Sequence, residues 1–196
     1  MTKFILVRHG EPTYQEVLEL GFKGHGLALA PLTECGIQKI KDISESKVFY
    51  HSDLLISSPY TRAMQTASII GHKHNLDVNV EILLHEWLPD LTHNYQSEEE
   101  FLTNIRIAKN EWQQQQKGNN LVLNSQIESL QHVRQRGLDV LARYCDYQKV
   151  IVVAHGLLIS MISPKLVKLK PGEFTVITSE QLEQCFDFKP KVLTKK

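Results

Sequence analysis

The chain of 196 residues has the length of one domain, and its hydrophobic content of 42% is enough to form a sizeable core. Lysine plus arginine and aspartate plus glutamate both number 22, so no net basic charge attracts nucleic acid or an acidic membrane surface. The longest apolar runs fall far short of the roughly 18 residues that cross a bilayer, which argues against a transmembrane protein.

The first predicted strand covers residues 3–8 and ends in a charged sequence. Its apolar run FILV belongs in a buried strand, yet the letters RHG follow at once. Residues 9–31 are expected to form a glycine-containing loop that Pro31 closes. Thr33 can then cap a helix whose apolar positions keep helical spacing at Ile37, Ile40 and Ile43.

The second unit begins at Asp53 and again has a strand, a turn and a helix. Ser57 or Ser58 can cap this helix, and Pro59 fits its first turn. Alternating apolar residues then predict a third strand over residues 78–84. The stripe that the helix buries is expected at Ala63, Ala67 and Ile70.

Two long helices are predicted next, and each opens with the sequence of a capping box. The first box pairs Ser97 with Glu100, and the second pairs Ser125 with Glu128. Both helices lie between the third strand and a later buried strand.

That later strand, VIVVA at residues 150–154, also leads into a His-Gly pair, and a helix over 156–162 follows it. The closing segments 173–178 and 185–188 are predicted strands, close enough to pair antiparallel at a sheet edge. Strands that alternate with helices predict an α/β fold, here a three-layer α/β/α sandwich around a mostly parallel sheet.

Side chains at the ends of these strands predict an anion site. In open α/β sheets, ligands bind beyond the carboxyl ends of the strands. The sequence places Arg8, His9, Arg62 and His155 there, together with the helix N-terminus near Pro59. Arginine binds phosphate oxygens through two parallel N–H groups, so this set of groups suits a phosphate dianion.

Five motifs make the chain resemble a known family. They are RHGE at 8–11, PLTECGIQ at 31–38, SSPYTRAMQTA at 57–67, LHE at 84–86 and VAHG at 153–156. In this order and spacing they are similar to the histidine phosphatase superfamily, whose fold is phosphoglycerate-mutase-like. The resemblance implies a single domain over residues 1–196, with a helical insertion at about 87–147 that covers the site.

The resemblance also implies a role for each site residue. His9 is the nucleophile that forms a phosphohistidine, and Glu86 gives a proton to the leaving oxygen. Arg8, Arg62 and His155 hold the phosphate oxygens. Two arginine charges oppose protonation of an imidazole whose ordinary pKa is about 6.5, so the nucleophile stays neutral at pH 7. The same charges offset those of the transferring group, so we expect no metal and no cofactor.

Three further residues are candidate substrate contacts. Gly10 and Gly156 would let the backbone approach the phosphate. Gln15 stands where many members of the family carry an asparagine that contacts phosphate. Mutases of the family carry extra arginines and a longer insertion, so the resemblance favours a phosphatase.

Three alternatives stay open. A mutase of the phosphoglycerate type would share the first half of the reaction and return the phosphoryl group to a substrate instead of water. A catalytically weak module would bind a phosphorylated ligand without turning it over. A zinc protein would use His72 with His74, or His85 with His93.

The expected partner is a phosphorylated small molecule, with no nucleic acid and no membrane. The three cysteines are odd in number and lack a CxxC spacing, and the start of the chain has too few apolar residues for a signal peptide. We therefore expect a cytoplasmic protein.

Overall fold

The computed structural model describes residues 1–93, 95, 97–119 and 124–191. Within these residues a five-stranded sheet has the order β3-β2-β4-β1-β5. The first four strands of this order run parallel, and β5 pairs antiparallel with β1. The predicted mostly parallel sheet is confirmed. The strands are β1 (Lys3–Arg8), β2 (Leu54–Ser57), β3 (Val78–Val80), β4 (Lys149–Ala154) and β5 (Phe174–Thr178).

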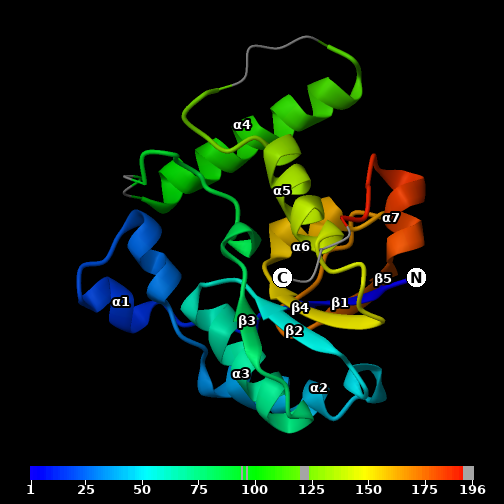
Figure 1. Cartoon of the computed structure of the whole chain (residues 1–196). Coiled ribbons are helices and arrows are strands. Elements are labelled where there is room, and N and C mark those ends of the chain that lie inside the picture. Colours follow the sequence, from blue (N-terminus) through cyan, green and yellow to red (C-terminus); the bar gives the residue numbers. More distant parts are fainter. Residues whose placement is uncertain (94, 96, 120–123, 192–196) are drawn as a thin grey trace.

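Helices cover both faces of the sheet, so the predicted three layers are confirmed (Figure 1). Alternate residues of β1 point to opposite faces, as a strand requires, and they enter two separate cores. One core packs under α2 (Glu34–Ser44) and α3 (Thr61–His74). The other packs under α5 (Leu130–Ala142), α6 (Gly156–Ile162) and α7 (Ser179–Cys185).

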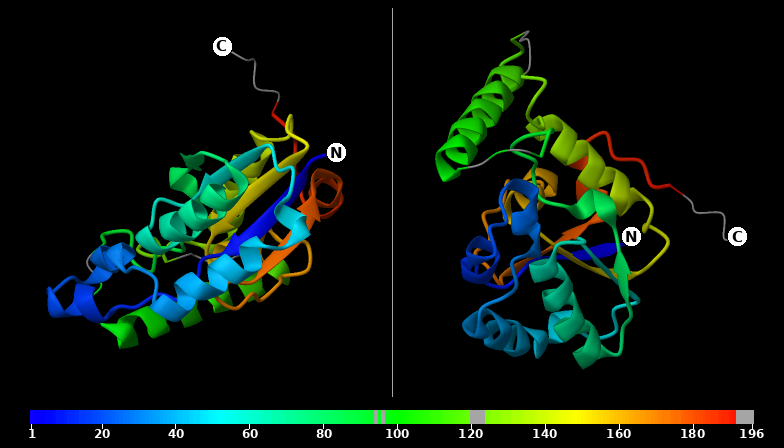
Figure 2. Two further views of the ribbon diagram at one scale, coloured as in Figure 1. Left: turned by 90° about the horizontal axis from the view of Figure 1, so that it is seen from below. Right: turned by 90° about the vertical axis from the view of Figure 1, so that its left-hand side faces the viewer.

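The remaining elements extend from this sandwich toward one side. The loop after β1 carries α1 (Gln15–Glu19) and a 3₁₀ turn, η1 (Gly24–Leu29). The long helix α4 (Glu98–Gln116) packs outside α5. Figures 1 and 2 show α1 near the N-terminal end of α4. Two further 3₁₀ turns are η2 (Lys47–Phe49) and η3 (Ile82–Leu84).

Two of the predicted helix starts are confirmed by their hydrogen bonds. The Thr33 hydroxyl accepts from the Gly36 N–H at the start of α2, and the Ser97 hydroxyl accepts from the Glu100 N–H at the start of α4. The stripe Ala63, Ala67 and Ile70 is fully buried, as predicted.

Two other predicted helix starts are wrong. The N-cap of α3 is Tyr60, whose side chain makes no capping bond. The Ser58 hydroxyl lies against a histidine and accepts the Tyr60 N–H, one residue before the helix begins. The second capping box also fails: Ser129, not Ser125, caps α5, and Glu128 turns inward to a buried ion pair.

Two predicted strands are also wrong in extent. The third strand ends at Val80, because residues 82–84 turn into η3 and bury Leu84. Residues 185–188 do not form a strand, since α7 runs to Cys185 and Phe188 packs into the core. The antiparallel partner of β5 is therefore β1.

The predicted extent of the domain, with an insertion over 87–147, stays a prediction. No helix among the described residues is long and apolar enough to cross a membrane.

Candidate active site

The sheet brings the two His-Gly sequences side by side. Parallel β1 and β4 are in register, with Arg8 opposite Ala154, so the residues that leave the two strands are neighbours. The imidazole centroids of His9 and His155 are 5.1 Å apart. Arg62 joins them from the first turn of α3, which follows β2 on the other side of β4.

The environment of His9 determines which of its nitrogens is free to react. Its Nδ1 lies 2.7 Å from the Gly10 carbonyl, which only accepts hydrogen bonds, so Nδ1 carries the proton. Nε2 therefore has a lone pair, and it accepts a hydrogen bond from Arg62 Nε at 3.2 Å. Burial first and the Arg62 charge second lower the pKa of His9 to about 3, so the imidazole is neutral at pH 7.

His155 is the most deeply buried member of the group. Its Nε2 lies 2.7 Å from the Ser58 hydroxyl, whose oxygen also accepts the Tyr60 N–H. The Ser58 hydroxyl can donate its proton to Nε2; the ring proton then lies on Nδ1. Burial, followed by the nearby charges of His9 and Arg62, holds the pKa of His155 well below its ordinary value.

Two buried nitrogen atoms at this point have no partner among the described residues: Arg8 Nε and His155 Nδ1. Such atoms are rare in proteins and call for a reason. The Arg8 guanidinium is otherwise fixed by donating from Nη1 to the Leu169 carbonyl at 2.7 Å. Its free Nε is therefore a fixed donor suited to an anion.

The structure gives packing reasons for both glycines of the His-Gly pairs. A Cβ at Gly156 would lie 3.0 Å from Arg8 Cζ, so glycine leaves room for the guanidinium. A Cβ at Gly10 would lie 3.0 Å from an Ile40 side-chain carbon and 3.1 Å from the Gly36 carbonyl, so glycine lets α2 approach. Close approach of the backbone to a phosphate stays a prediction.

Glu86 reaches the same place from the segment after η3. Its carboxylate accepts hydrogen bonds from the N–H groups of Trp87, Leu157 and Leu158, at 3.0, 3.2 and 3.2 Å. The last two belong to the first turn of α6, where N–H groups have no partner within the helix. The Glu86 carboxylate is thus bound to the two residues that directly follow the His155–Gly156 pair.

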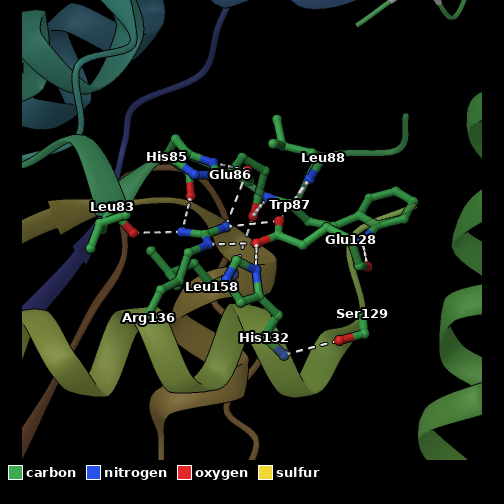
Figure 3. A network of polar contacts seen from close by, with 10 residues as sticks. All are labelled: Leu83, His85, Glu86, Trp87, Leu88, Glu128, Ser129, His132, Arg136 and Leu158. Carbon is green, nitrogen blue, oxygen red and sulfur yellow. Dashed lines mark hydrogen bonds and ion pairs between the residues drawn. The ribbon is translucent and has the colours of Figure 1, made fainter. Parts of the chain in front are cut away.

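Sequence reasoning missed the ion pair between Glu128 and Arg136, which lies beside Glu86 (Figure 3). Both side chains are buried. Burial alone would raise the pKa of Glu128, but the hydrogen bonds and the charge of Arg136 lower it overall. Glu128 and Arg136 are eight residues apart in the sequence, and this spacing does not predict that their side chains form an ion pair. Ser58 was noticed only as a possible helix cap.

A cavity of about 670 Å³ opens from this point toward α1 and α4. Arg8, His9, Arg62 and Glu86 border it, while His155 lies behind them. Its outer walls include several aromatic rings from the loop after β1 and from residues 87–101: Tyr14, Phe22, His25, Trp87, His93, Tyr95 and Phe101.

Several other candidate residues lie away from the reactive group. Gln15 on α1 donates to Glu19 and is not among the residues that border the cavity. His74 Nε2 lies 2.8 Å from the Ser44 carbonyl, and His85 Nδ1 lies 2.7 Å from the Glu86 carbonyl.

Known proteins resemble this chain in sequence and in fold. The chain is 26% identical over 176 residues to the adenosylcobalamin/alpha-ribazole phosphatase of Escherichia coli K12, covering 86% of this chain and 80% of the relative. Bacillus stearothermophilus YhfR has a similar fold, with a TM-score of 0.67 at 21% identity, covering 91% of each chain. A phosphoserine phosphatase from Entamoeba histolytica, solved with 3-phosphoglyceric acid, also has a similar fold, with a TM-score of 0.65 at 22% identity. The match covers 100% of this chain and 96% of the other. The model of the histidine phosphatase superfamily (branch 1) matches residues 4–183, and the chain belongs to that superfamily.

Proposed function

We propose that the protein hydrolyses a phosphomonoester through a phosphohistidine on Nε2 of His9. One observation carries the proposal: a buried, neutral imidazole presents a lone pair at the base of a cavity, beside two guanidinium groups. A neutral nitrogen is what nucleophilic attack requires, and fixed positive charges are what a phosphoryl group requires.

As the substrate binds, Arg62 Nε exchanges its bond with His9 Nε2 for one with a phosphate oxygen, which frees the lone pair. In the first step, His9 Nε2 attacks phosphorus and the bond from phosphorus to the ester oxygen breaks. Glu86, as the carboxylic acid, gives its proton to that oxygen, so an alcohol leaves. Nδ1 keeps its proton and its bond to the Gly10 carbonyl, which stabilises the charge on the phosphorylated ring. Donors from Arg8, Arg62 and His155 hold the three remaining phosphate oxygens.

In the second step, water attacks phosphorus and the bond from phosphorus to Nε2 breaks. The Glu86 carboxylate takes a proton from this water, and inorganic phosphate leaves. The neutral imidazole and the protonated Glu86 are restored, so all atoms and protons balance. The names of the phosphatase relatives support transfer to water over return to a substrate.

The proposed site needs no metal, because the arginines meet the charge of the transferring group. The outer cavity supports a small-molecule ester whose leaving group carries a flat, apolar ring, since several aromatic side chains line its walls.

The phosphohistidine can be tested by labelling. Reaction with ³²P-labelled substrate in the presence of a chelator, followed by rapid quenching, should leave an acid-labile, alkali-stable label on His9. His9→Ala should lose both the label and turnover. A label on serine or aspartate, or a label that requires added metal, would contradict the mechanism.

A further inference from the structure

The segment that carries Glu86, residues 83–88, has little regular structure of its own. It begins with the last two residues of the short turn η3 and continues as irregular chain toward α4. A carboxylate on such a segment keeps its place only if other groups hold the backbone. Figure 3 shows that two side chains, Arg136 of α5 and Glu128 just before it, lie directly against this segment.

Arg136 holds the carbonyl groups of the segment. Its Nη1 donates to the carbonyls of Leu83 and His85 at 2.6 and 2.8 Å, and Nη2 donates to the carbonyl of Glu86 at 3.3 Å. Its two remaining N–H groups donate to the Glu128 carboxylate at 2.7 and 3.1 Å. All five donors of the guanidinium are thus used, three of them on the segment that carries Glu86.

Glu128 holds the other end of the same segment. Its carboxylate accepts the Leu88 N–H at 3.0 Å, and its backbone N–H donates to the Leu88 carbonyl at 3.1 Å. Its carbonyl accepts the indole N–H of Trp87 at 2.6 Å. The residues on both sides of Glu86 are therefore tied to the ion pair.

We propose that Arg136 and Glu128 are positioning residues for Glu86, which they hold at the start of α6, where its carboxylate faces the cavity. The inference rests on the proposed function, because it explains how Glu86 is kept within reach of the leaving group. Stability alone is a weak reason for this pair, since buried ion pairs are often replaced by apolar residues at no cost. The distribution of the donors over the carbonyls of Leu83, His85 and Glu86, all in one short segment, is specific to a positioning role.

The test uses Arg136→Lys, which keeps the positive charge opposite Glu128 but cannot reach three carbonyls and a carboxylate together. Arg134→Lys is the matched control: Arg134 lies on the same helix and donates to the Met161 carbonyl at 2.9 Å. Among the described residues its guanidinium also lies over the rings of Trp112 and Phe186, outside the segment 83–88. Glu128→Gln is the second variant, in case Arg136→Lys does not fold.

Turnover is compared for glycerol 2-phosphate, whose alkoxide needs a proton, and for p-nitrophenyl phosphate, whose phenolate leaves unaided. Arg136→Lys should lower kcat/KM, which reports only the steps through departure of the leaving group, roughly tenfold or more for the alkyl ester, within the range that a general acid supplies, and leave kcat/KM for the aryl ester nearly unchanged. Combined with Glu86→Gln, it should add no further preference for the aryl ester. Arg134→Lys should behave like the unmodified protein.

Amide hydrogen exchange gives a readout that does not depend on activity. If Glu86 moves away, the N–H groups of Leu157 and Leu158 lose their acceptor and should exchange faster in Arg136→Lys. Equal losses on both esters, with unchanged exchange at Leu157 and Leu158, would overturn the positioning role. If Glu86→Gln itself lowers both esters equally while Arg136→Lys still speeds exchange, the positioning role stands and the assignment of Glu86 as proton donor fails.

Discussion

At the scale of single residues, the buried imidazole of His9 ties the stability of the protein to pH. The unfolded chain takes up a proton on this group near its ordinary pKa of 6.5, whereas the folded protein does so only near pH 3. Between these values the unfolded state binds more protons, so the free energy of unfolding falls as the pH falls. The depressed pKa of His155 acts in the same direction.

His9→Gln should therefore reduce the acid sensitivity of folding. Urea unfolding measured from pH 6.5 to pH 4 should show a slope of stability against pH that is smaller by up to about 1.4 kcal/mol per pH unit, which is one proton. Part of the slope should remain because His155 is still present. An unchanged slope would mean that His9 is protonated in the folded protein within this range.

At the scale of secondary-structure elements, the crossing of α5 and α6 depends on a helical glycine. A Cβ at Gly137 would lie 2.5 Å from Ile162 Cγ2 and 2.9 Å from Leu158 Cδ1. Both neighbours are fully buried, so neither side chain has free space to enter. The helix that begins at the second His-Gly pair is thus packed against α5 without a gap.

Gly137→Ala should destabilise the protein despite the higher helix propensity of alanine. The gain in propensity is at most about 1 kcal/mol, while overpacking a core costs about 1–3 kcal/mol, and contacts of 2.5 Å favour the upper end. We expect a net loss of about 1–2 kcal/mol in chemical denaturation, with Gln135→Ala on the exposed face as the control. A gain in stability would show that α6 moves aside easily.

The elements also show what could be predicted from the sequence. Strands such as β1 and β4 are apolar on both faces and lead into a His-Gly pair, so their place at the candidate site could be predicted without a structure. The start of α5 could not, because Glu128 suits a helix N-terminus and a buried ion pair equally well. Which of the two roles Glu128 takes depends on its tertiary contact with Arg136, and the local spacing of residues does not predict that contact.

At the scale of the whole molecule, the cavity limits which esters fit. Its volume of about 670 Å³ exceeds what a phosphate group needs, and residues from two distant parts of the chain enclose it. Beyond the two arginines, its outer part has one lysine, Lys23, against two acidic residues, Asp90 and Glu98. A second phosphate on the substrate would find little positive charge there.

A panel of phosphorylated metabolites should therefore favour monoesters with a flat ring over sugar bisphosphates. Phe22→Ala should raise KM for the preferred ring-bearing ester several-fold, since an aromatic contact contributes about 0.5–1.5 kcal/mol. The same change should leave KM for a small ester such as glycerol 2-phosphate unaltered. A panel led by bisphosphates would show that the outer cavity does not select the substrate in this way.

The strand order β3-β2-β4-β1-β5 has a consequence for folding during synthesis on the ribosome. A ribosome completes β1, β2 and β3 well before β4, yet β4 lies between β1 and β2 and is the partner of both. Until β4 arrives, two strands that are apolar on both faces have open edges, a state that invites wrong pairing. A nascent chain that stops before residue 149 already contains His9, both arginines and Glu86, but lacks the strand that brings β1 and β2 together.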